Sequence, residues 1–333
     1  MKTSSRFHAT LILLFVATSA LFLLSLVTGP ASVSLSDSLA ALFGRGDELL
    51  VLVMQEIRLP RALLGLIIGA TLGLSGAALQ GYLRNPLAEP GLIGVSASAS
   101  LGAVIAIYTG LSAAFAIALP LLALAGAVVA VLLLQVMAGP DGRPLTVILA
   151  GVAISSLAGA MTSLVLNLSP NPFAAMEIMF WMLGSLTDRS MPHVWLILPF
   201  TLIGWAMLFR LGRALDALTL GPDAAASMGV NLKSTQRLAV IGTALAVGAA
   251  TAVSGAIGFV GLVVPHVLRP LVGAQPSRLL PASALGGAAL LLLADILVRV
   301  IAPGRDLKLG VLTAIVGAPF FFWLVWSHRR KAQ

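Results

Sequence analysis

The sequence contains no cysteine and few charged residues. Only 10% of its 333 residues are Asp, Glu, Lys or Arg, whereas an ordinary soluble domain has about 25%. The absence of cysteine excludes disulfides and thiol chemistry. The low charge content, together with 59% hydrophobic residues and a mean hydropathy of +1.04, excludes an ordinary soluble domain.

Sequence signatures of catalysis are also missing. None of the four histidines stands in a metal-ligand spacing such as H-E-x-x-H, and there is no G-x-S-x-G. A nucleotide-binding P-loop reads G-x-x-x-x-G-K-[ST], but the one Lys-Ser pair, Lys233-Ser234, follows Leu232 instead of glycine. We therefore expect no catalytic residue, no metal site and no ATP hydrolysis by this chain.

Long apolar runs fill most of the chain. A helix needs about 20 apolar residues to cross about 30 Å of hydrocarbon. Strands of a membrane barrel are instead alternating segments of about ten residues. The runs are continuous and lie near residues 9–28, 60–82, 92–109, 113–137, 145–168, 193–211, 236–253, 256–271, 280–301 and 308–327. We predict an all-α membrane protein with about ten transmembrane helices in a single domain over 1–333.

The placement of basic residues orients these helices, because Lys and Arg favour cytoplasmic loops. With both termini in the cytoplasm, thirteen of the twenty Lys and Arg residues lie inside, and acids balance the basic residues outside. The first run is unbroken over Leu11–Val27, longer than the apolar region of a secretory signal. We therefore expect it to be retained as a helix.

Two features lie within the predicted spans. Gly65, Gly69 and Gly73 recur every four residues, as in seams where helix backbones approach closely. Asp295 stands four residues before Arg299, so an intramembrane ion pair is predicted. An ionisable residue at this depth marks a functional site by default, and a charge neutralised by its neighbour is the alternative.

The cytoplasmic segment 212–233 is predicted to hold two short helices broken at Gly221-Pro222. Pro222 suits the first turn of a helix, Asp223 complements its N-terminal dipole, and Gly229 suits its end. Five apolar positions are expected to be exposed there and to form a docking surface, although a linker is the alternative: Leu215, Leu218, Leu220, Met228 and Val230.

A second cytoplasmic segment, Arg84 to Gly91, contains two prolines and a glycine. These residues impose a fixed, irregular backbone. A rigid gate at the mouth of a pore and a simple turn both fit this composition.

Several longer motifs follow one another along nearly the whole chain: Arg58-Leu-Pro-Arg61, Gly69 to Gly76, Gln80 to Gly94, Phe180 to Leu186, Gly258 to Arg269, Leu293 to Arg299 and Gly310 to Phe320. Together these motifs resemble the permease subunits of ABC importers for iron chelates, haem and cobalamin. One motif departs from the family pattern: Asp306-Leu-Lys308 stands where members commonly have Glu-Leu-Pro.

The resemblance implies ten helices per subunit, both termini in the cytoplasm, and a homodimer around a central path in the bacterial inner membrane. It also implies two ABC ATPase subunits inside and a periplasmic substrate-binding protein outside. ATP and magnesium would be bound by the ATPase subunits, and this chain would bind no cofactor.

The resemblance also assigns roles to residues. Three arginines match those that receive acidic residues of the binding protein: Arg58, Arg61 and Arg299. The ATPase-coupling element matches the segment that contains Leu215, Leu218, Gly221, Pro222, Asp223, Met228 and Gly229. The cytoplasmic gate loop matches Asn85, Pro86 and Leu87.

We therefore predict the permease subunit of an ATP-driven importer that moves an iron chelate (ferric siderophore or haem) or cobalamin into the cytoplasm by alternating access. An ion-coupled secondary transporter is the alternative, and it would need intramembrane carboxylates or broken helices as coupling sites. A membrane scaffold that transports nothing is a third reading.

Overall fold

The structure is a computed structural model that describes residues 2–29, 34–115, 117–139, 144–169, 171–302, 304 and 307–331. Within these residues the chain is helical and has no strand, which confirms the all-α prediction. The longer helices are α1 (Lys2–Val27), α4 (Leu59–Tyr82), α5 (Val95–Tyr108), α7 (Ala118–Ala138), α8 (Pro144–Asn167), α10 (Met191–Phe209), α13 (Leu232–Ser254), α15 (Pro276–Ile301) and α16 (Leu309–Lys331).

Shorter elements connect these helices. They are α2 (Leu35–Leu42), α3 (Glu48–Leu52), the π-helix η1 (Val53–Arg58), the 3-10 helix η2 (Pro90–Ile93), α6 (Leu111–Ala114), α9 (Pro172–Met182), α11 (Gly212–Leu218), α12 (Pro222–Ser227) and α14 (Val260–Leu268). The segment after residue 168, where no helix is predicted from the sequence, holds α9. Its helix is capped by Asn171, whose side chain accepts a hydrogen bond from the Phe173 amide.

Each of the ten predicted runs contains a helix, and seven helices of the described chain are long and apolar enough to cross a membrane. Two predicted spans are too long. The run 92–109 gives only α5, because Gly94 has a φ of 79° and ends the 3-10 turn before it. The run 256–271 gives only α14, which begins after Phe259 at a φ of 68°.

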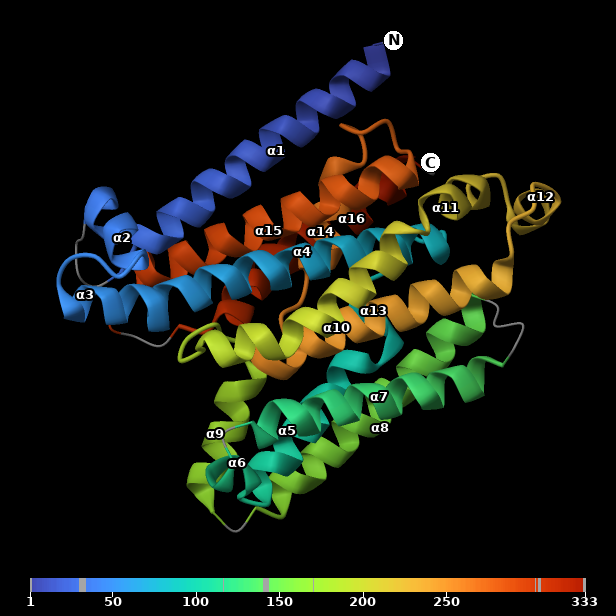
Figure 1. Cartoon of the computed structure of the whole chain (residues 1–333). Coiled ribbons are helices and arrows are strands. Elements are labelled where there is room, and N and C mark those ends of the chain that lie inside the picture. The colour runs from blue at the N-terminus through green and yellow to red at the C-terminus, as the bar shows by residue number, and fades with distance from the viewer. Residues whose placement is uncertain are drawn as a thin grey trace.

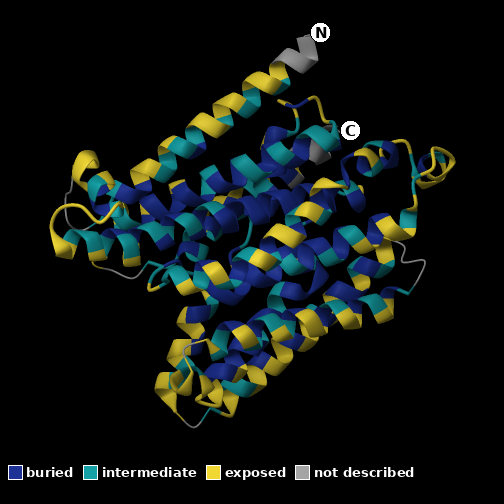
Figure 2. Cartoon of the chain, viewed as in Figure 1, coloured by how far each residue is buried: buried dark blue, intermediate teal, exposed yellow. Residues whose placement is uncertain are grey.

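The long helices pack side by side with α4 and α13 at the centre (Figure 1). Helix α4 packs against α15, α13, α14 and α10, and α13 connects this group to α5 and α7. These two helices are the most buried of the candidate spans and α1 is the least buried. Exposed residues lie along α1, α7 and α8 (Figure 2). Many of these are large and apolar, as expected for surfaces that face lipid or another subunit.

The glycine stripe of α4 forms the predicted helix seam. A Cβ atom built on Gly69 would lie 2.4 Å from the carbonyl oxygen of Gly287, and one on Gly73 would lie 2.0 Å from that of Ser283. Both carbonyls belong to α15. The backbones of α4 and α15 therefore approach so closely that no side chain fits between them.

The molecule has two distinct ends (Figure 1). Helices α11 and α12 lie at one end, and the start of α1 and the C-terminus lie toward the same end. Helices α2 and α3 lie at the other. Because α4 runs from one end to the other, the arginines at its start lie far from the loop that follows its last residue.

Candidate functional site

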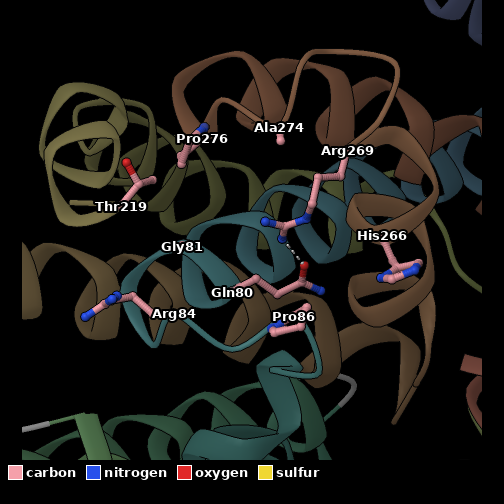
Figure 3. A pocket seen from close by; sticks show the side chains of 9 residues that line it. All are labelled: Gln80, Gly81, Arg84, Pro86, Thr219, His266, Arg269, Ala274 and Pro276. Atoms are coloured by element: carbon pink, nitrogen blue, oxygen red, sulfur yellow. Dashed lines mark hydrogen bonds between the residues drawn. The ribbon is translucent and has the colours of Figure 1, made fainter. Parts of the chain in front are cut away.

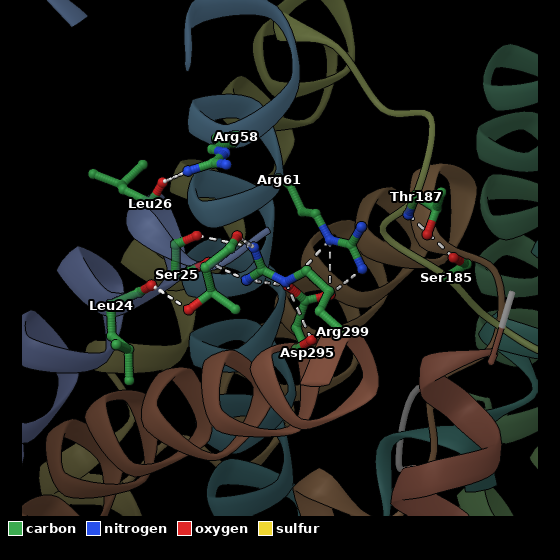
Figure 4. Close-up of polar contacts among 10 residues, drawn as sticks. Leu24, Ser25, Leu26, Arg58, Arg61, Ser185, Thr187, Asp295 and Arg299 are labelled. Atoms are coloured by element: carbon green, nitrogen blue, oxygen red, sulfur yellow. Dashed lines mark hydrogen bonds and ion pairs between the residues drawn. The ribbon is translucent and has the colours of Figure 1, made fainter. Parts of the chain in front are cut away.

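Two arginines pair with one carboxylate where α4 and α15 meet, and a third arginine, Arg58, lies nearby and is bound to the end of α1 (Figure 4). Arg61 donates from Nε and Nη2 to Asp295, with its Nη2 2.8 Å from Oδ1. Arg299 Nη2 lies 2.8 Å from Asp295 Oδ2, so the ion pair predicted from the sequence is present. Asp295 itself is only 1% exposed. The bidentate contact from Arg61, 234 residues away, is one that sequence spacing does not reveal.

The same arginines hold the end of α1. Arg58 donates from Nη1 to the carbonyls of Leu26 and Val27, at 3.0 and 3.1 Å. Arg299 donates to the carbonyl and hydroxyl oxygens of Ser25 and to the carbonyl of Thr28. The last carbonyls of a helix have no partner within it, so these guanidinium groups satisfy the end of α1.

The arginine cluster carries an excess of positive charge. It contains three guanidinium groups and one carboxylate, and the charges of Arg58, Arg61 and Asp295 all act on Arg299. Arg58 is only 5% exposed, whereas the side chain of Arg61 is 15% exposed. The Nη1 atom of Arg61 donates to no group in the described chain, so Arg61 has the most freedom to bind an additional partner. Arg58 also ends a π-helix, a form that is frequent at functional sites.

At the opposite end of α4, the predicted gate loop has a fixed backbone. The Asn85 side chain accepts a hydrogen bond from the amide of Leu87 at 2.9 Å, which is a local turn of the Asx type. The Asn85 amide donates to the carbonyl of Gln80. Arg84 has a φ of 51°, in the left-handed region. Side chains and backbone together therefore hold this loop in one conformation.

A cavity of about 350 Å³ adjoins this loop. Its lining carries two arginines and a histidine but no acid (Figure 3): Gln80, Gly81, Arg84, Pro86, Thr219, His266, Arg269, Ala274 and Pro276. Arg269 Nη2 donates to Gln80 Oε1 at 2.8 Å, and this bond links α14 to the last turn of α4. The cavity lies between the predicted gate loop and the predicted coupling segment.

The predicted coupling segment contains the two short helices expected, broken at Gly221. Gly221 has a φ of 110° and Pro222 begins α12. Met228 is the C-cap that follows α12, and Gly229 comes next with a φ of 85°. The prediction of two helices in this segment is confirmed.

The predicted exposure of Leu215 and Leu218 is wrong. Leu215 is 0% exposed and Leu218 is 5% exposed. They stand three residues apart on α11, so they share one face, and Leu215 packs beside Gly81 of α4. Leu220 and Met228 are exposed at 68% and 63%. The exposed apolar surface of this segment is therefore smaller than predicted, and Leu215 attaches α11 to α4.

Sequence reasoning missed two carboxylates near these segments. Glu89, just after the gate loop, accepts a hydrogen bond from the Phe259 amide at 2.6 Å. Burial raises the pKa of the Glu89 carboxyl above its ordinary value, and the Phe259 hydrogen bond partly offsets this rise. Asp216 of α11 accepts hydrogen bonds from the first turn of α15. Neither carboxylate stands in a sequence spacing that indicates its partner.

The motif Asp306-Leu-Lys308, which departs from the family pattern, lies partly outside the described residues, since Asp306 is not described. Lys308 is described, and its Nζ lies 5.5 Å from the centre of the Phe180 ring. Within the described chain, no group of three or more His, Asp or Glu side chains is arranged to hold a metal ion.

The FecCD transport family model matches residues 14–327 of this chain. The chain belongs to the FecCD transport family. This finding confirms the family resemblance that the motifs indicate, and the match extends over both the arginine cluster and the gate loop.

Relatives within the FecCD family cover most of the chain. It is 39% identical to the ferric enterobactin transport system permease protein FepD of Escherichia coli, over 97% of this chain and 94% of the relative. It is 40% identical to the cobalamin import system permease protein BtuC of Halobacterium salinarum, over 84% and 75%. It is 41% identical to an ABC transporter permease protein of Bacillus subtilis, YvrB, over 86% and 82%.

A solved structure shares this architecture. The chain superposes with a TM-score of 0.85 and 31% identity on a metal-chelate type ABC transporter in an inward-facing conformation, covering 95% of this chain and 98% of the other. The fold of this FecCD family member is therefore that of an ABC importer permease.

Proposed function

We propose that this chain is the membrane-spanning subunit of an ATP-driven importer that moves an iron chelate or cobalamin into the bacterial cytoplasm by alternating access. Family membership over residues 14–327 supports this proposal most directly. Relatives named for ferric enterobactin, ferric dicitrate and cobalamin support the substrate class. Among iron chelates we favour a ferric siderophore or haem.

The arrangement of charged and coupling segments supports the polarity of this importer. The arginine cluster lies at the α2 and α3 end, and α11 and α12 lie at the other (Figure 1). We assign the arginine end to the periplasm and the α11 end, with both chain termini, to the cytoplasm of a multi-pass inner-membrane protein. This assignment agrees with the excess of basic residues in the predicted cytoplasmic loops.

The arginine cluster is proposed as the docking point for acidic residues of a periplasmic binding protein. Its excess positive charge attracts carboxylates, and an arginine fork receives a carboxylate through two hydrogen bonds. Arg61 would make the first contact because its Nη1 is available. The positive charges of Arg58 and Arg299 nearby would strengthen the attraction to the incoming carboxylate. Docking therefore should not require breaking the contacts to Asp295.

The opposite end is proposed to bind two ABC ATPase subunits through α11 and α12. Leu220 and Met228 offer exposed apolar surface there, and Gly221, Pro222, Asp223 and Gly229 fix the angle between the two helices. Asn85, Pro86 and Leu87 would close the path on the cytoplasmic side. A second copy of the chain would complete that path, since α8 and α16 present exposed apolar faces.

Binding measurements on the purified complex test this assignment. We expect Arg61→Gln to weaken docking of the binding protein about tenfold, the cost of one charged contact, while the ATPase subunits still co-purify. Arg45→Gln is the matched control, because Arg45 is exposed, lies at the same end and stands outside the cluster. Equal docking by both variants would refute the docking role, and absence of any co-purifying ATPase with the unmodified chain would refute the importer proposal.

A further inference from the structure

The last turn of α4, just before the gate loop, is attached to α14. The Gln80 side chain is 2% exposed, and its Nε2 lies 3.3 Å from the carbonyl oxygens of both Gly261 and Leu262, in the first turn of α14. Its Oε1 accepts a hydrogen bond from Arg269, which directly follows the last residue of α14. A single side chain at the end of α4 thus contacts both ends of α14.

The chain is attached to α14 a second time just after the gate loop, through Glu89. Phe259 caps α14 in the left-handed region, with a φ of 68°, which is uncommon for a bulky residue. No side chain of α14 or its N-cap accepts from the first turn, although the first amides of a helix need outside acceptors. Glu89 supplies one from 170 residues away, and its negative charge suits the N-terminus of a helix.

Close packing accompanies the hydrogen bonds that Gln80 and Glu89 make with α14. A Cβ atom built on Gly261 would lie 2.6 Å from Cδ of Pro90, and one on Gly76 would lie 2.0 Å from the carbonyl oxygen of Gly261. The first turn of α14 therefore fits between α4 and the end of the gate loop without room to slide. Backbone contacts this close fix the relative position of the segments.

Another carboxylate attaches α11 to the start of α15, the helix that follows α14. Asp216 accepts from the Ser277 amide through Oδ1, at 2.8 Å, and from Gln275 Nε2 through Oδ2, at 2.9 Å. Gln275 and Ser277 lie where the turn after α14 enters α15. Asp216 thus caps α15 from a neighbouring element, just as Glu89 caps α14.

We propose that α14 and the adjoining start of α15 transmit movement of the ATPase-coupling helix α11 to the gate loop. Asp216 is the positioning residue where α11 meets the start of α15, and Glu89 is the positioning residue where the chain just after the gate loop meets α14. The roles of α11 and the gate loop rest on the proposed function, and the path between them is the new element. Packed side chains and hydrogen bonds carry coupling between distant sites where two elements move as one. In this account the gate loop follows α14 and does not bend independently.

Hydrogen exchange at the Phe259 amide tests the Glu89 joint without any transport assay. Glu89→Met removes the acceptor and keeps a side chain of similar length, whereas Glu89→Gln keeps an oxygen that accepts. In the nucleotide-free complex, we expect exchange of this amide to accelerate at least about tenfold in Glu89→Met, because local opening becomes easier, and to be unchanged in Glu89→Gln. Wild-type protection in Glu89→Met would overturn the joint.

Spin-label distances test whether the loop and α14 move together. The chain has no cysteine, so labels attach only at the two exposed positions chosen, Arg84→Cys in the loop and Val267→Cys in α14. We expect the distance between the labels to stay constant between nucleotide-free and ATP-bound complexes, and to broaden in Glu89→Met. A distance that changes with nucleotide in the otherwise unmodified chain would contradict joint movement.

Transport per ATP hydrolysed tests the complete path. Glu89→Met and Asp216→Ala are expected to lower this ratio about tenfold, a typical size for a coupling free energy. Glu89→Gln keeps the oxygen that accepts from the Phe259 amide and should retain the ratio. Asp216→Asn keeps one of the two accepting oxygens and should lower the ratio less than Asp216→Ala does. Normal ratios in both disruptive variants would refute transmission through α14 while the importer proposal stands. If the unmodified complex shows no ATP-dependent uptake, the importer proposal fails, and the exchange and label measurements still decide whether the joint exists.

Discussion

At the residue scale, the single carboxylate of Asp295 forms ion pairs with two arginines and so connects α15 to α4. It pairs with Arg61 of α4 and with Arg299 of its own helix, and it is almost completely buried. Removing one member of a buried ion pair costs more than the pair contributes, because the remaining charge loses its partner. Asp295 is therefore expected to dominate the stability of the arginine cluster.

Replacing Asp295 by Asn should lower the free energy of unfolding by about 3 kcal/mol, since the guanidinium groups of Arg61 and Arg299 then lose their negative partner. Arg61→Gln should cost less, because Asp295 keeps Arg299. Thermal unfolding in detergent checks this order, with the exposed Glu177→Gln as control. An Asp295→Asn protein as stable as the control would show that the cluster does not depend on its carboxylate.

The raised pKa of Glu89 predicts a pH dependence. A carboxyl whose pKa is higher in the folded state contributes stability that is present below its ordinary pKa and is lost as pH rises through the raised value. Glu89→Gln removes this term. Its stability relative to the unmodified chain should therefore increase as pH rises above about 4, the ordinary pKa of a Glu carboxyl. Unfolding at each pH measures this, and a constant difference would contradict the raised pKa.

At the scale of elements, the seam between α4 and α15 connects the two ends of the molecule. Gly69 and Gly73 let the two backbones meet where a side chain would collide with carbonyl oxygens. Because α4 begins at the arginine cluster and ends at the gate loop, this seam fixes the relative position of both sites. A change in the seam is expected to disturb them together.

Gly73→Ala should destabilise the chain by about 2 kcal/mol, the usual cost of overpacking, because its new methyl group meets a backbone carbonyl. Gly159→Ala is the matched control: it also lies inside a long helix, and a Cβ there meets nothing within 4 Å. Thermal unfolding of the two variants gives the comparison. Equal stability of the two variants would show that α4 and α15 can move apart to accept the methyl group without losing stability.

The spacing of residues close in sequence predicted several features of these elements. Contacts between residues far apart in sequence could not be predicted in this way. The i, i+4 spacing of Asp295 and Arg299 gave their ion pair, and Gly221-Pro222 gave the break between α11 and α12. The start of α14 was missed because a phenylalanine, not a glycine, takes the left-handed turn there. Leu215 was misplaced because a short segment does not show which of its faces packs on α4.

At the scale of the whole molecule, the two ends of the bundle carry different chemistry. One end holds a buried cluster with excess positive charge, and the other holds short helices with exposed apolar side chains beside a fixed loop. This separation fits an importer that binds its substrate-binding protein on the outer side and its ATPase subunits on the inner side. An ion-coupled transporter would need an intramembrane acid that binds ions, but Asp295 is already paired with two arginines.

Uptake into proteoliposomes tests the importer proposal most directly. The chain would be reconstituted with its ATPase and binding-protein partners and offered a ferric siderophore, haem or cobalamin, with and without ATP inside the compartment that faces α11 and α12. We predict uptake of one of these compounds that requires ATP and the binding protein. Uptake driven by an ion gradient in the absence of the ATPase subunits would contradict the account.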